Sequence, residues 1–163
     1  MSTSNAEDLP ATSRAVAAAL RAVGIEPDIR ELPESARTAV DAARAMDCPV
    51  AAIANSLVFA CEGAPLLIMT SGANRVDADA LAARLGTGPI TRAKPDFVRA
   101  ATGQAIGGVA PVGHPEPVTT VVDESLADQH TIWAAAGTPH TLFPTTYDDL
   151  VAMTKGRPVR VTS

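Results

Sequence analysis

Residues 102–115 read Thr-Gly-Gln-Ala-Ile-Gly-Gly-Val-Ala-Pro-Val-Gly-His-Pro and form the most informative stretch of this chain. Four glycines and two prolines stand among fourteen residues, with Ile106, Val109 and Val112 as apolar anchors. Glycine lets a ligand approach the main chain closely, and proline fixes φ, which stiffens a loop. The stretch predicts an anchored glycine loop that presents main-chain N–H groups to a carbonyl or a phosphate. An ordinary long turn is the alternative that glycine and proline alone favour.

The composition predicts one soluble domain, which we expect in the cytoplasm. A chain of 163 residues is long enough for a single core, and 47% hydrophobic with only 3% aromatic content means that small aliphatic side chains build it. Residues 1–8 are polar and acidic and do not resemble a signal peptide, and no apolar run is long enough to cross a membrane. We expect a flexible tail over residues 1–10 and a single domain over residues 11–163.

Charge and cysteine content narrow the function classes. A net charge of −5 argues against strong non-specific binding to nucleic acid, although a small basic patch near a site is compatible with it. Two cysteines are too few for a disulfide framework, and three dispersed histidines do not have the spacing of a metal site. We therefore expect neither a metal nor a cofactor.

Hydrophobic periodicity, caps and turn residues predict short strands mixed with helices. The expected helices are 12–23, with Thr12 or Ser13 as N-cap, then one starting after Thr38, 78–85, 95–101, a short turn after Asp123, and one ending at Met153. The expected strands are 25–32, 53–61, 66–71, 90–93, 118–122, 131–136, 141–143 and 159–161, with a hairpin turn at 62–65. This order predicts an α/β domain of the α+β type with a mixed sheet. The glycine loop follows a helix, which argues against a dinucleotide-binding unit.

Several side chains are candidates for a site, each with a structural alternative. Asn55 and Ser56 are polar in an apolar strand and need hydrogen-bond partners, either structural or in a pocket. His140 lies in a turn between two expected strands, where substrate contact and a purely structural role are both open. His114 and His130 are interpreted as surface residues. A catalytic thiol at Cys61 is a weaker hypothesis.

Motifs in sequence order resemble those of a known family. They are Thr38-Ala39 with Ala42-Ala43, residues 53–59 (Ile-Ala-Asn-Ser-Leu-Val-Phe), the glycine loop, Asp123 with Leu126, residues 136–140 (Ala-Gly-Thr-Pro-His) and Asp149-Leu150. The chain resembles the YbaK/ProX family of free-standing aminoacyl-tRNA editing domains, which are related to the editing insert of bacterial prolyl-tRNA synthetases. The resemblance extends over residues 11–161, and the glycine loop is its most specific part.

This resemblance implies a mixed, largely antiparallel, barrel-like sheet flanked by helices, and hydrolysis of the ester of a mischarged aminoacyl-tRNA. The implied partner is the 3′ end of that tRNA, held weakly unless a synthetase or another protein delivers it. Fixed N–H donors would stabilise the oxyanion while a water, assisted by the 2′-hydroxyl of the terminal adenosine, attacks the ester. The implied catalytic residues are Gly107, His140 and Asn55, and the implied substrate-binding residues are Gly108, Val109, Pro111, Ser56, Gly137 and Thr38.

One position departs from the family pattern. Asn55 stands where the family commonly has a lysine, and an amide forms hydrogen bonds but cannot act as a phosphate-binding cation. The leading hypothesis is a trans-acting deacylase that removes a small wrong amino acid from a tRNA. The alternative is a catalytically silent module that binds an aminoacyl-adenosine-like ligand or a synthetase.

Overall fold

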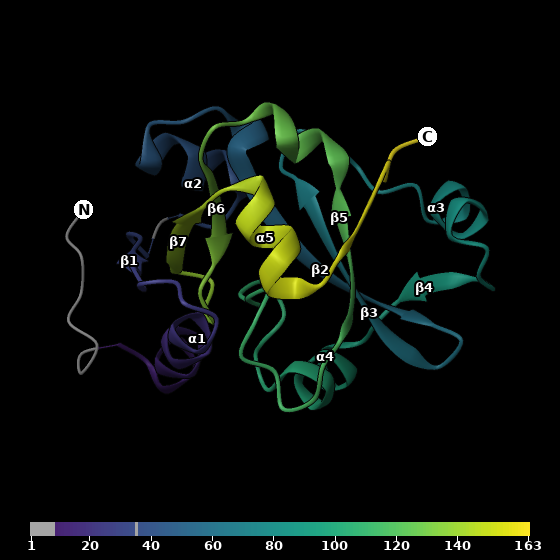
Figure 1. Ribbon diagram of the computed structural model, residues 1–163, viewed down its shortest axis with the longest axis horizontal. Helices are drawn as coiled ribbons and strands as arrows, with labels where there is room; N and C mark the ends of the chain where they lie inside the picture. The colour runs from purple at the N-terminus through teal and green to yellow at the C-terminus, as the bar shows by residue number, and fades with distance from the viewer. Residues whose placement is uncertain (1–8, 35) are drawn as a thin grey trace.

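The computed structural model describes residues 9–34 and 36–163, and within them one mixed sheet is flanked by helices (Figure 1). The helices are α1 (Ala11–Ala22), α2 (Ala39–Met46), α3 (Ala78–Leu85), α4 (Pro95–Thr102) and α5 (Tyr147–Thr154), with the 3₁₀ helices η2 (Val50–Ala52) and η3 (Glu124–Asp128). The strands are β1 (Arg30–Glu31), β2 (Ile53–Cys61), β3 (Ala64–Ser71), β4 (Ile90–Arg92), β5 (Thr119–Asp123), β6 (Ile132–Ala135), β7 (Thr141–Thr145) and β8 (Arg157–Val159). In this part of the chain no helix is long and apolar enough to cross a membrane.

The sheet combines both strand directions, which confirms the predicted fold class. Its hydrogen-bonded order is β1-β7-β6-β2-β3-β5-β8, and β4 pairs with β2 beside this path. Among the described strands the pairs β1–β7, β2–β3, β2–β4 and β6–β7 are antiparallel, whereas β2–β6, β3–β5 and β5–β8 are parallel. Strands β2 and β3 therefore form the centre, where both directions meet.

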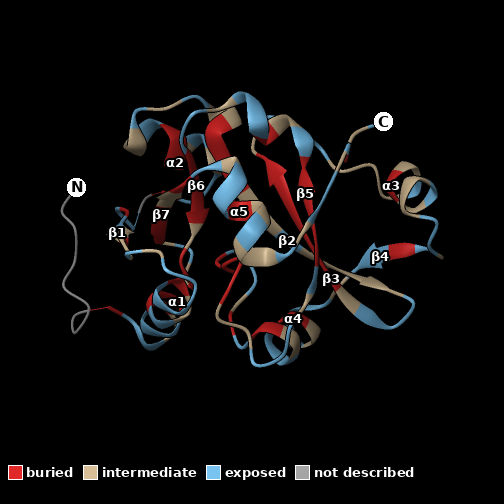
Figure 2. Ribbon diagram, in the orientation of Figure 1, coloured by how far each residue is buried: buried red, intermediate tan, exposed pale blue. Residues whose placement is uncertain are grey.

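Alternation along β3 separates two faces of the core. Leu67 and Met69 are fully buried among residues of α1, α4 and α5, whereas Leu66 and Ile68 pack on the opposite face with Leu81 of α3. Successive side chains of a strand point to opposite faces, so a strand buried on both sides reads as a continuous apolar run. Figure 2 shows this burial in the central strands and exposed surfaces on the surrounding helices.

The β2–β3 hairpin is tighter than predicted. Glu62 and Gly63 both have positive φ, 53° and 83°, and β3 already begins at Ala64, so a two-residue turn replaces the expected four-residue turn at 62–65. Two central residues in the left-handed region form the turn that matches the right-handed twist of a hairpin. This geometry makes Cys61 and Ala64 a directly opposed pair and sets the register of the whole hairpin.

The start of the first helix differs from the prediction. Helix α1 begins after Pro10, which makes no side-chain cap. Ser13 does not cap the helix, because it is buried and its Oγ donates to the carbonyl of Ala136 at 2.7 Å. Leu9, within the expected tail, is only 4% exposed and packs in the main core, whereas residues 1–8 of that tail lie outside the described residues.

Two expected strands also change. The strand expected over 25–32 is limited to Arg30–Glu31 in the structure, because only these residues pair with β7. The last strand is Arg157–Val159 rather than 159–161, because the register with β5 pairs Val121 with Arg157 and Asp123 with Val159. In both cases pairing across the sheet decided the bounds, and local residue preferences did not.

A buried carboxylate joins three segments at one end of the sheet. Asp123 is 2% exposed and accepts hydrogen bonds from the main-chain N–H of Ser71 and Ser125 and from the side chains of Thr70 and Asn74, at 2.9–3.2 Å. Burial by itself raises the pKa of this carboxyl, but the hydrogen bonds from Asn74, Ser71 and Ser125 outweigh it and leave the pKa below its usual value. Its predicted role as a helix cap is confirmed.

We expect Asp123→Asn to lower the free energy of unfolding at neutral pH by about 2–4 kcal/mol, because charge-assisted hydrogen bonds are lost or weakened. The lowered pKa means that the native carboxylate stabilises the fold above pH ~4 and that this stabilisation is lost as the pH falls through the folded-state pKa. The difference between parent and variant should therefore shrink as the pH is lowered. Urea unfolding between about pH 7 and pH 3 measures it; a constant difference would contradict the assignment.

Candidate active site

The sheet is split beside the middle of β2. On the side away from β3, β2 pairs with β6 only at Ile53 and Ala54 and with β4 only from Phe59 to Cys61. Residues 55–58 therefore have no registered strand partner on that side among the described strands. Five residue steps separate Ala54 from Phe59, which is roughly 16 Å of extended chain. An opening of that length along a strand edge can admit a small molecule.

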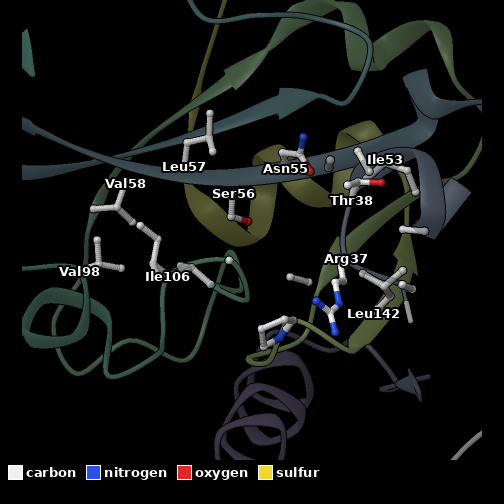
Figure 3. Close-up of a pocket in the computed structure, with 18 of the residues that line it drawn as sticks. Arg37, Thr38, Ile53, Asn55, Ser56, Leu57, Val58, Val98, Ile106 and Leu142 are labelled. Atoms are coloured by element: carbon white, nitrogen blue, oxygen red, sulfur yellow. The ribbon is translucent and has the colours of Figure 1, made fainter. Parts of the chain in front are cut away.

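A cavity of about 520 Å³ occupies this split (Figure 3). The segment before α2, strand β2, the end of β4, helix α4, the glycine loop and the turn after β6 all contribute to its wall. The side chains and main chain that line it include Arg37, Thr38, Asn55, Ser56, Leu57, Val58, Arg92, Val98, Ile106, Gly107, Val109 and Pro139. The volume lies within the usual range for small-molecule sites.

Gln104 holds the glycine loop in shape, and sequence reasoning did not identify it. Its side chain is 2% exposed, its Oε1 accepts from the N–H of Ala110 at 2.6 Å, and its Nε2 donates to the carbonyl of Val112 at 3.3 Å. The side-chain hydroxyl of Thr102 accepts from the N–H of Gln104 at 3.1 Å. A glutamine in a loop is ordinary in a sequence, and only its burial in the structure shows that its amide needs these partners.

His114 braces the same loop, which corrects its interpretation as a surface residue. It is half-buried, and its Nε2 lies 2.7 Å from the carbonyl oxygen of Ala110, so Nε2–H is the donor. Burial lowers the pKa of His114 and favours the neutral ring that this hydrogen bond uses. The side chains of Gln104 and His114 therefore hold the main chain of the glycine loop through hydrogen bonds.

The two glycines in the middle of the loop have different roles. A Cβ on Gly108 would lie 2.3 Å from the carbonyl carbon of Thr138 and 2.5 Å from the nitrogen of Pro139. Gly108 thus allows the loop to pack directly against the turn after β6. Gly107 has φ +91° and open space where a Cβ would stand, and it lines the cavity.

The glycine loop offers free main-chain donors, but not at Gly108. The N–H of Gly108 donates to the carbonyl of Ala105 at 3.1 Å, and the N–H of Ala110 is held by Gln104. Gly107 and Val109 line the cavity, and within the described chain their N–H groups have no acceptor. These two groups are therefore the main-chain donors of the loop at the cavity that are not used within the described chain.

The start of α2 places a cation at the cavity. Thr38 caps the helix by accepting from the N–H of Asp41 at 3.1 Å, as predicted, and the Asp41 carboxylate accepts from the N–H of Arg37 at 3.0 Å. This reciprocal arrangement resembles a capping box and fixes the main chain of Arg37. In Figure 3 the Arg37 guanidinium lies on the same side of β2 as Ser56 and Ile106.

Among the residues that the structure describes, the charged groups lining the cavity are two arginines, Arg37 and Arg92, and no carboxylate lines it. No ion pair to either arginine occurs within residues 9–34 and 36–163. The net charge of −5 therefore conceals a local excess of positive charge. Neither arginine was identified from the sequence, although the Thr38-x-x-Asp41 spacing could have indicated that residue 37 sits at a helix start.

Asn55 and Ser56 point to opposite sides of β2. Figure 3 shows Asn55 and Leu57 on one side, and Ser56 and Val58 on the side of Val98 and Ile106. The Ser56 hydroxyl donates to Met69 Sδ at 3.2 Å across the strand pair. Both residues line the cavity, but only the side chain of Ser56 shares a face with the apolar part of the glycine loop.

Five of the nine predicted site residues line the cavity, and the other four do not. Thr38, Asn55, Ser56, Gly107 and Val109 line the cavity, whereas Gly108, Pro111, Gly137 and His140 do not. Pro111 is a buried residue of the glycine loop, and a Cβ on Gly137 would lie 3.0 Å from the main chain of Thr12.

His140 stands beside the cavity rather than in its wall. Its carbonyl accepts from the N–H of Leu32 at 2.7 Å, and its N–H donates to Thr138 Oγ1 at 3.2 Å. Its side-chain Nδ1 is buried without a partner within the described chain. Cys61, the weaker candidate, is also outside the cavity wall and packs with the α3 side of the core.

The chain matches known proteins over nearly its whole length. Residues 33–153 match the family model described as the aminoacyl-tRNA editing domain. A crystal structure described as that of a "putative trans-editing enzyme for prolyl tRNA synthetase" is similar, with 39% identity and a TM-score of 0.91 over 96% of this chain and 99% of that one. A scaffold from work on epitope backbone grafting has 37% identity and a TM-score of 0.90, over 95% and 99% of the two chains.

A hypothetical protein, APE2540, with 23% identity and a TM-score of 0.81 over 90% of this chain and 98% of that one, shares the fold. No protein of curated function matches this chain. The family model covers most of the chain, and similarity at 39% identity runs from end to end of the matched structure. The chain therefore belongs to the aminoacyl-tRNA editing domain family.

Proposed function

We propose that this protein hydrolyses, in trans, the ester bond of a tRNA that carries a small wrong amino acid. The observation that carries the proposal is the cavity in the split sheet, which combines free main-chain N–H donors, an apolar wall and two arginines. An aminoacyl-tRNA 3′ end has a matching set of groups: an acyl carbonyl, a small side chain and phosphates.

The polar groups of the wall favour a reaction that uses the substrate's own hydroxyl. The polar side chains there are those of Arg37, Thr38, Asn55, Ser56 and Arg92, and none of these is a general base near neutral pH. A water attacks the acyl carbon, and Gly107 or Val109 N–H stabilises the oxyanion. The proton from the water passes through the neighbouring 2′-hydroxyl to the departing 3′-oxygen, so the products are a free amino acid and a tRNA with both hydroxyls intact.

The apolar wall supports a small side chain on the substrate. Val58, Val98 and Ile106 stand on one side of β2, and Val109 also lines the cavity. Such a wall distinguishes one methylene by only about 1–3 kcal/mol, and it excludes larger side chains by size. Synthetase delivery would compensate for a weak hold on the body of the tRNA.

A panel of mischarged tRNAs tests the proposal. With purified protein in excess over each substrate, we expect deacylation of alanyl, seryl or prolyl esters at rates at least about tenfold above those of leucyl and phenylalanyl esters. The panel includes tRNA for proline charged with alanine, because one similar structure is described as a trans-editing enzyme for prolyl tRNA synthetase. Folded protein that hydrolyses no member of the panel would exclude the enzymatic function.

The alternative, a silent binding module, depends on Asn55. If the parent is inactive and Asn55→Lys hydrolyses a substrate, the parent is a binding module. If the parent is active and Asn55→Lys gains no activity, the protein is an enzyme adapted to asparagine at this position. Cys61 lies outside the cavity wall, so Cys61→Ala should leave the deacylation rate within about twofold of the parent value. A large loss of deacylation rate in Cys61→Ala would instead support a catalytic thiol.

We expect Arg37→Gln to raise KM for aminoacyl-tRNA by about tenfold or more, with little change in kcat. The guanidinium would bind a phosphate of the terminal nucleotides, and one charge-assisted hydrogen bond contributes about 1.5–3 kcal/mol. The slope of log KM against log salt should also fall by about 0.7, the value for one phosphate contact on a single strand. Arg21→Gln is the matched control, since Arg21 is exposed on α1 and outside the cavity wall. Equal effects of the two substitutions would contradict a specific contact at Arg37.

A further inference from the structure

The main chain of Ser56 faces the split with both of its hydrogen-bonding groups. In an antiparallel pair, opposed residues alternate between those that bond to each other and those whose N–H and C=O point away. The carbonyl of Ile53 accepts from the N–H of Gly72 at 2.7 Å, so Ile53 faces β3. The continuous register then makes Asn55 and Leu57 face β3 as well, and leaves Ala54, Ser56, Val58 and Ala60 facing the other side.

Independent contacts agree with this alternation. The hydroxyl of Thr91 on β4 donates to the carbonyl of Ala60, and β6 pairs with β2 at Ala54. Ser56 lies between these two positions, where neither neighbouring strand has a registered residue among those described. The N–H and C=O of Ser56 thus stand side by side at a strand edge that forms the cavity wall.

We propose that Ser56 binds the aminoacyl group of the substrate as though it were one residue of a neighbouring antiparallel strand. The N–H of Ser56 donates to the acyl carbonyl oxygen, and the C=O of Ser56 accepts from the α-ammonium group. An α-aminoacyl ester has its amine and its carbonyl on the same carbon, as a residue of a strand does, so one residue can form both bonds. This inference rests on the proposed function and identifies how that same site recognises its substrate class.

The pairing also fixes where the substrate's side chain lies. Directly opposed residues of an antiparallel pair place their side chains on the same face of the sheet. An L-aminoacyl group opposite Ser56 therefore places its side chain beside the Ser56 hydroxyl, toward Val58, Val98 and Ile106 (Figure 3). A D-aminoacyl group held by the same two bonds would direct its side chain to the side of Asn55 and Leu57. The site should select aminoacyl groups that have a free α-amine and the L configuration.

The strand polarity orients the remainder of the substrate. A ligand antiparallel to β2 has its amine toward Val58 and its ester oxygen toward Ala54. The nucleotide attached to that oxygen then lies near the start of α2, where Arg37 and Thr38 line the cavity. The same pose brings the acyl carbonyl to a strand N–H, which adds a donor to those that the glycine loop provides.

The first experiment uses a probe that cannot be hydrolysed, 3′-(L-alanylamino)-3′-deoxyadenosine. At saturation we expect hydrogen exchange of the Ser56 amide, followed by NMR, to slow by at least about tenfold, because its N–H becomes bonded. The amides of Asn55 and Leu57, which already face β3, serve as internal references. Unchanged exchange at Ser56 in a saturated complex overturns the proposal.

Two analogues of the probe test the amine and the chirality. The propionyl analogue lacks only the amine and should bind at least about tenfold more weakly, because the C=O of Ser56 is then left without a donor. The D-alanyl analogue should lose a similar factor. Equal affinities for all three compounds overturn the proposal, whether or not the protein deacylates tRNA. Deacylation of L-alanyl and D-alanyl tRNA at equal rates would likewise overturn it and leave the proposed function standing.

Proline substitutions test the orientation of the main chain. Ser56→Pro removes an N–H that faces the cavity, whereas Leu57→Pro removes one from the ladder with β3. We expect Leu57→Pro to lower Tm by about 10 °C more than Ser56→Pro, and folded Ser56→Pro to bind the L-alanyl probe at least about tenfold more weakly. Full affinity in folded Ser56→Pro overturns the proposal; if that variant does not fold, the exchange experiment on the parent decides.

Discussion

Gly108→Ala should lose both stability and deacylation activity. The added Cβ would stand 2.3 Å from the carbonyl carbon of Thr138 and 2.5 Å from the nitrogen of Pro139, where main-chain atoms cannot give way as the end of a side chain can. We expect the free energy of unfolding to fall by about 3 kcal/mol, the range of a forced overpacking. The glycine loop and the turn after β6 must also separate, and a shift of about 1 Å at a site costs roughly a hundredfold in rate.

Gly86→Ala is the matched control for this substitution. Gly86 closes α3 with φ +71°, and a Cβ there meets no atom within 4 Å. That variant should lose only about 1 kcal/mol from the left-handed backbone and keep the activity of the parent. Chemical unfolding and single-turnover deacylation of the two variants measure the contrast. If Gly108→Ala is no more harmful than Gly86→Ala, close packing of the two segments does not support the site.

Gln104→Leu should lower the free energy of unfolding by about 2–4 kcal/mol and reduce kcat more than it raises KM. Leucine fills a similar volume but leaves the N–H of Ala110 and the C=O of Val112 buried without partners, and each such group costs about 1–3 kcal/mol. The loop then loses the hydrogen bonds that hold its two ends. Gly107 and Val109 would present their N–H groups less precisely, which weakens oxyanion stabilisation most.

The control is Gln129→Leu, in which the same residue types are exchanged at a half-exposed position after η3. Its stability should change by less than about 0.5 kcal/mol and its activity should stay at the parent level. Urea unfolding and the ratio of kcat to KM for one good substrate measure both variants. A Gln104→Leu protein with parent stability and parent kcat would show that the loop keeps its shape without the buried amide.

Local signals account for many helix ends, and periodicity indicated the central strands. Thr38, Asp77 and Thr146 cap α2, α3 and α5 with their side chains, and Gly86 and Gly103 close α3 and α4 in the left-handed region. Caps act within one turn of the chain, so sequence alone identifies them. Ser13 shows the limit of this reasoning, because a residue suited to capping is instead buried by a contact with Ala136, 123 residues away in the sequence.

The candidate site divides in the same way. The glycine loop, Asn55 and Ser56 stood out as unusual residue types in their local context. Asn55, Ser56 and part of the loop line the cavity. Arg37, Arg92 and Gln104 did not stand out, because an arginine before a helix, an arginine at a strand end and a glutamine in a loop are ordinary in a sequence. His140 stood out and yet lies beside the cavity, because the turn that holds it contributes Pro139 to the wall instead.

The sequence by itself determined the family, the mixed α/β class and a stiff glycine loop, because motif order, periodicity and backbone freedom are properties of neighbouring residues. Only the tertiary structure decided that β2 is left open between β6 and β4, that the Ser56 main chain faces this opening, and that Gly108 packs against Thr138 and Pro139. These features arise from strand register and from contacts between segments that are not neighbours in the sequence. Pairing across a sheet depends on which strands meet, and no local pattern contains that information.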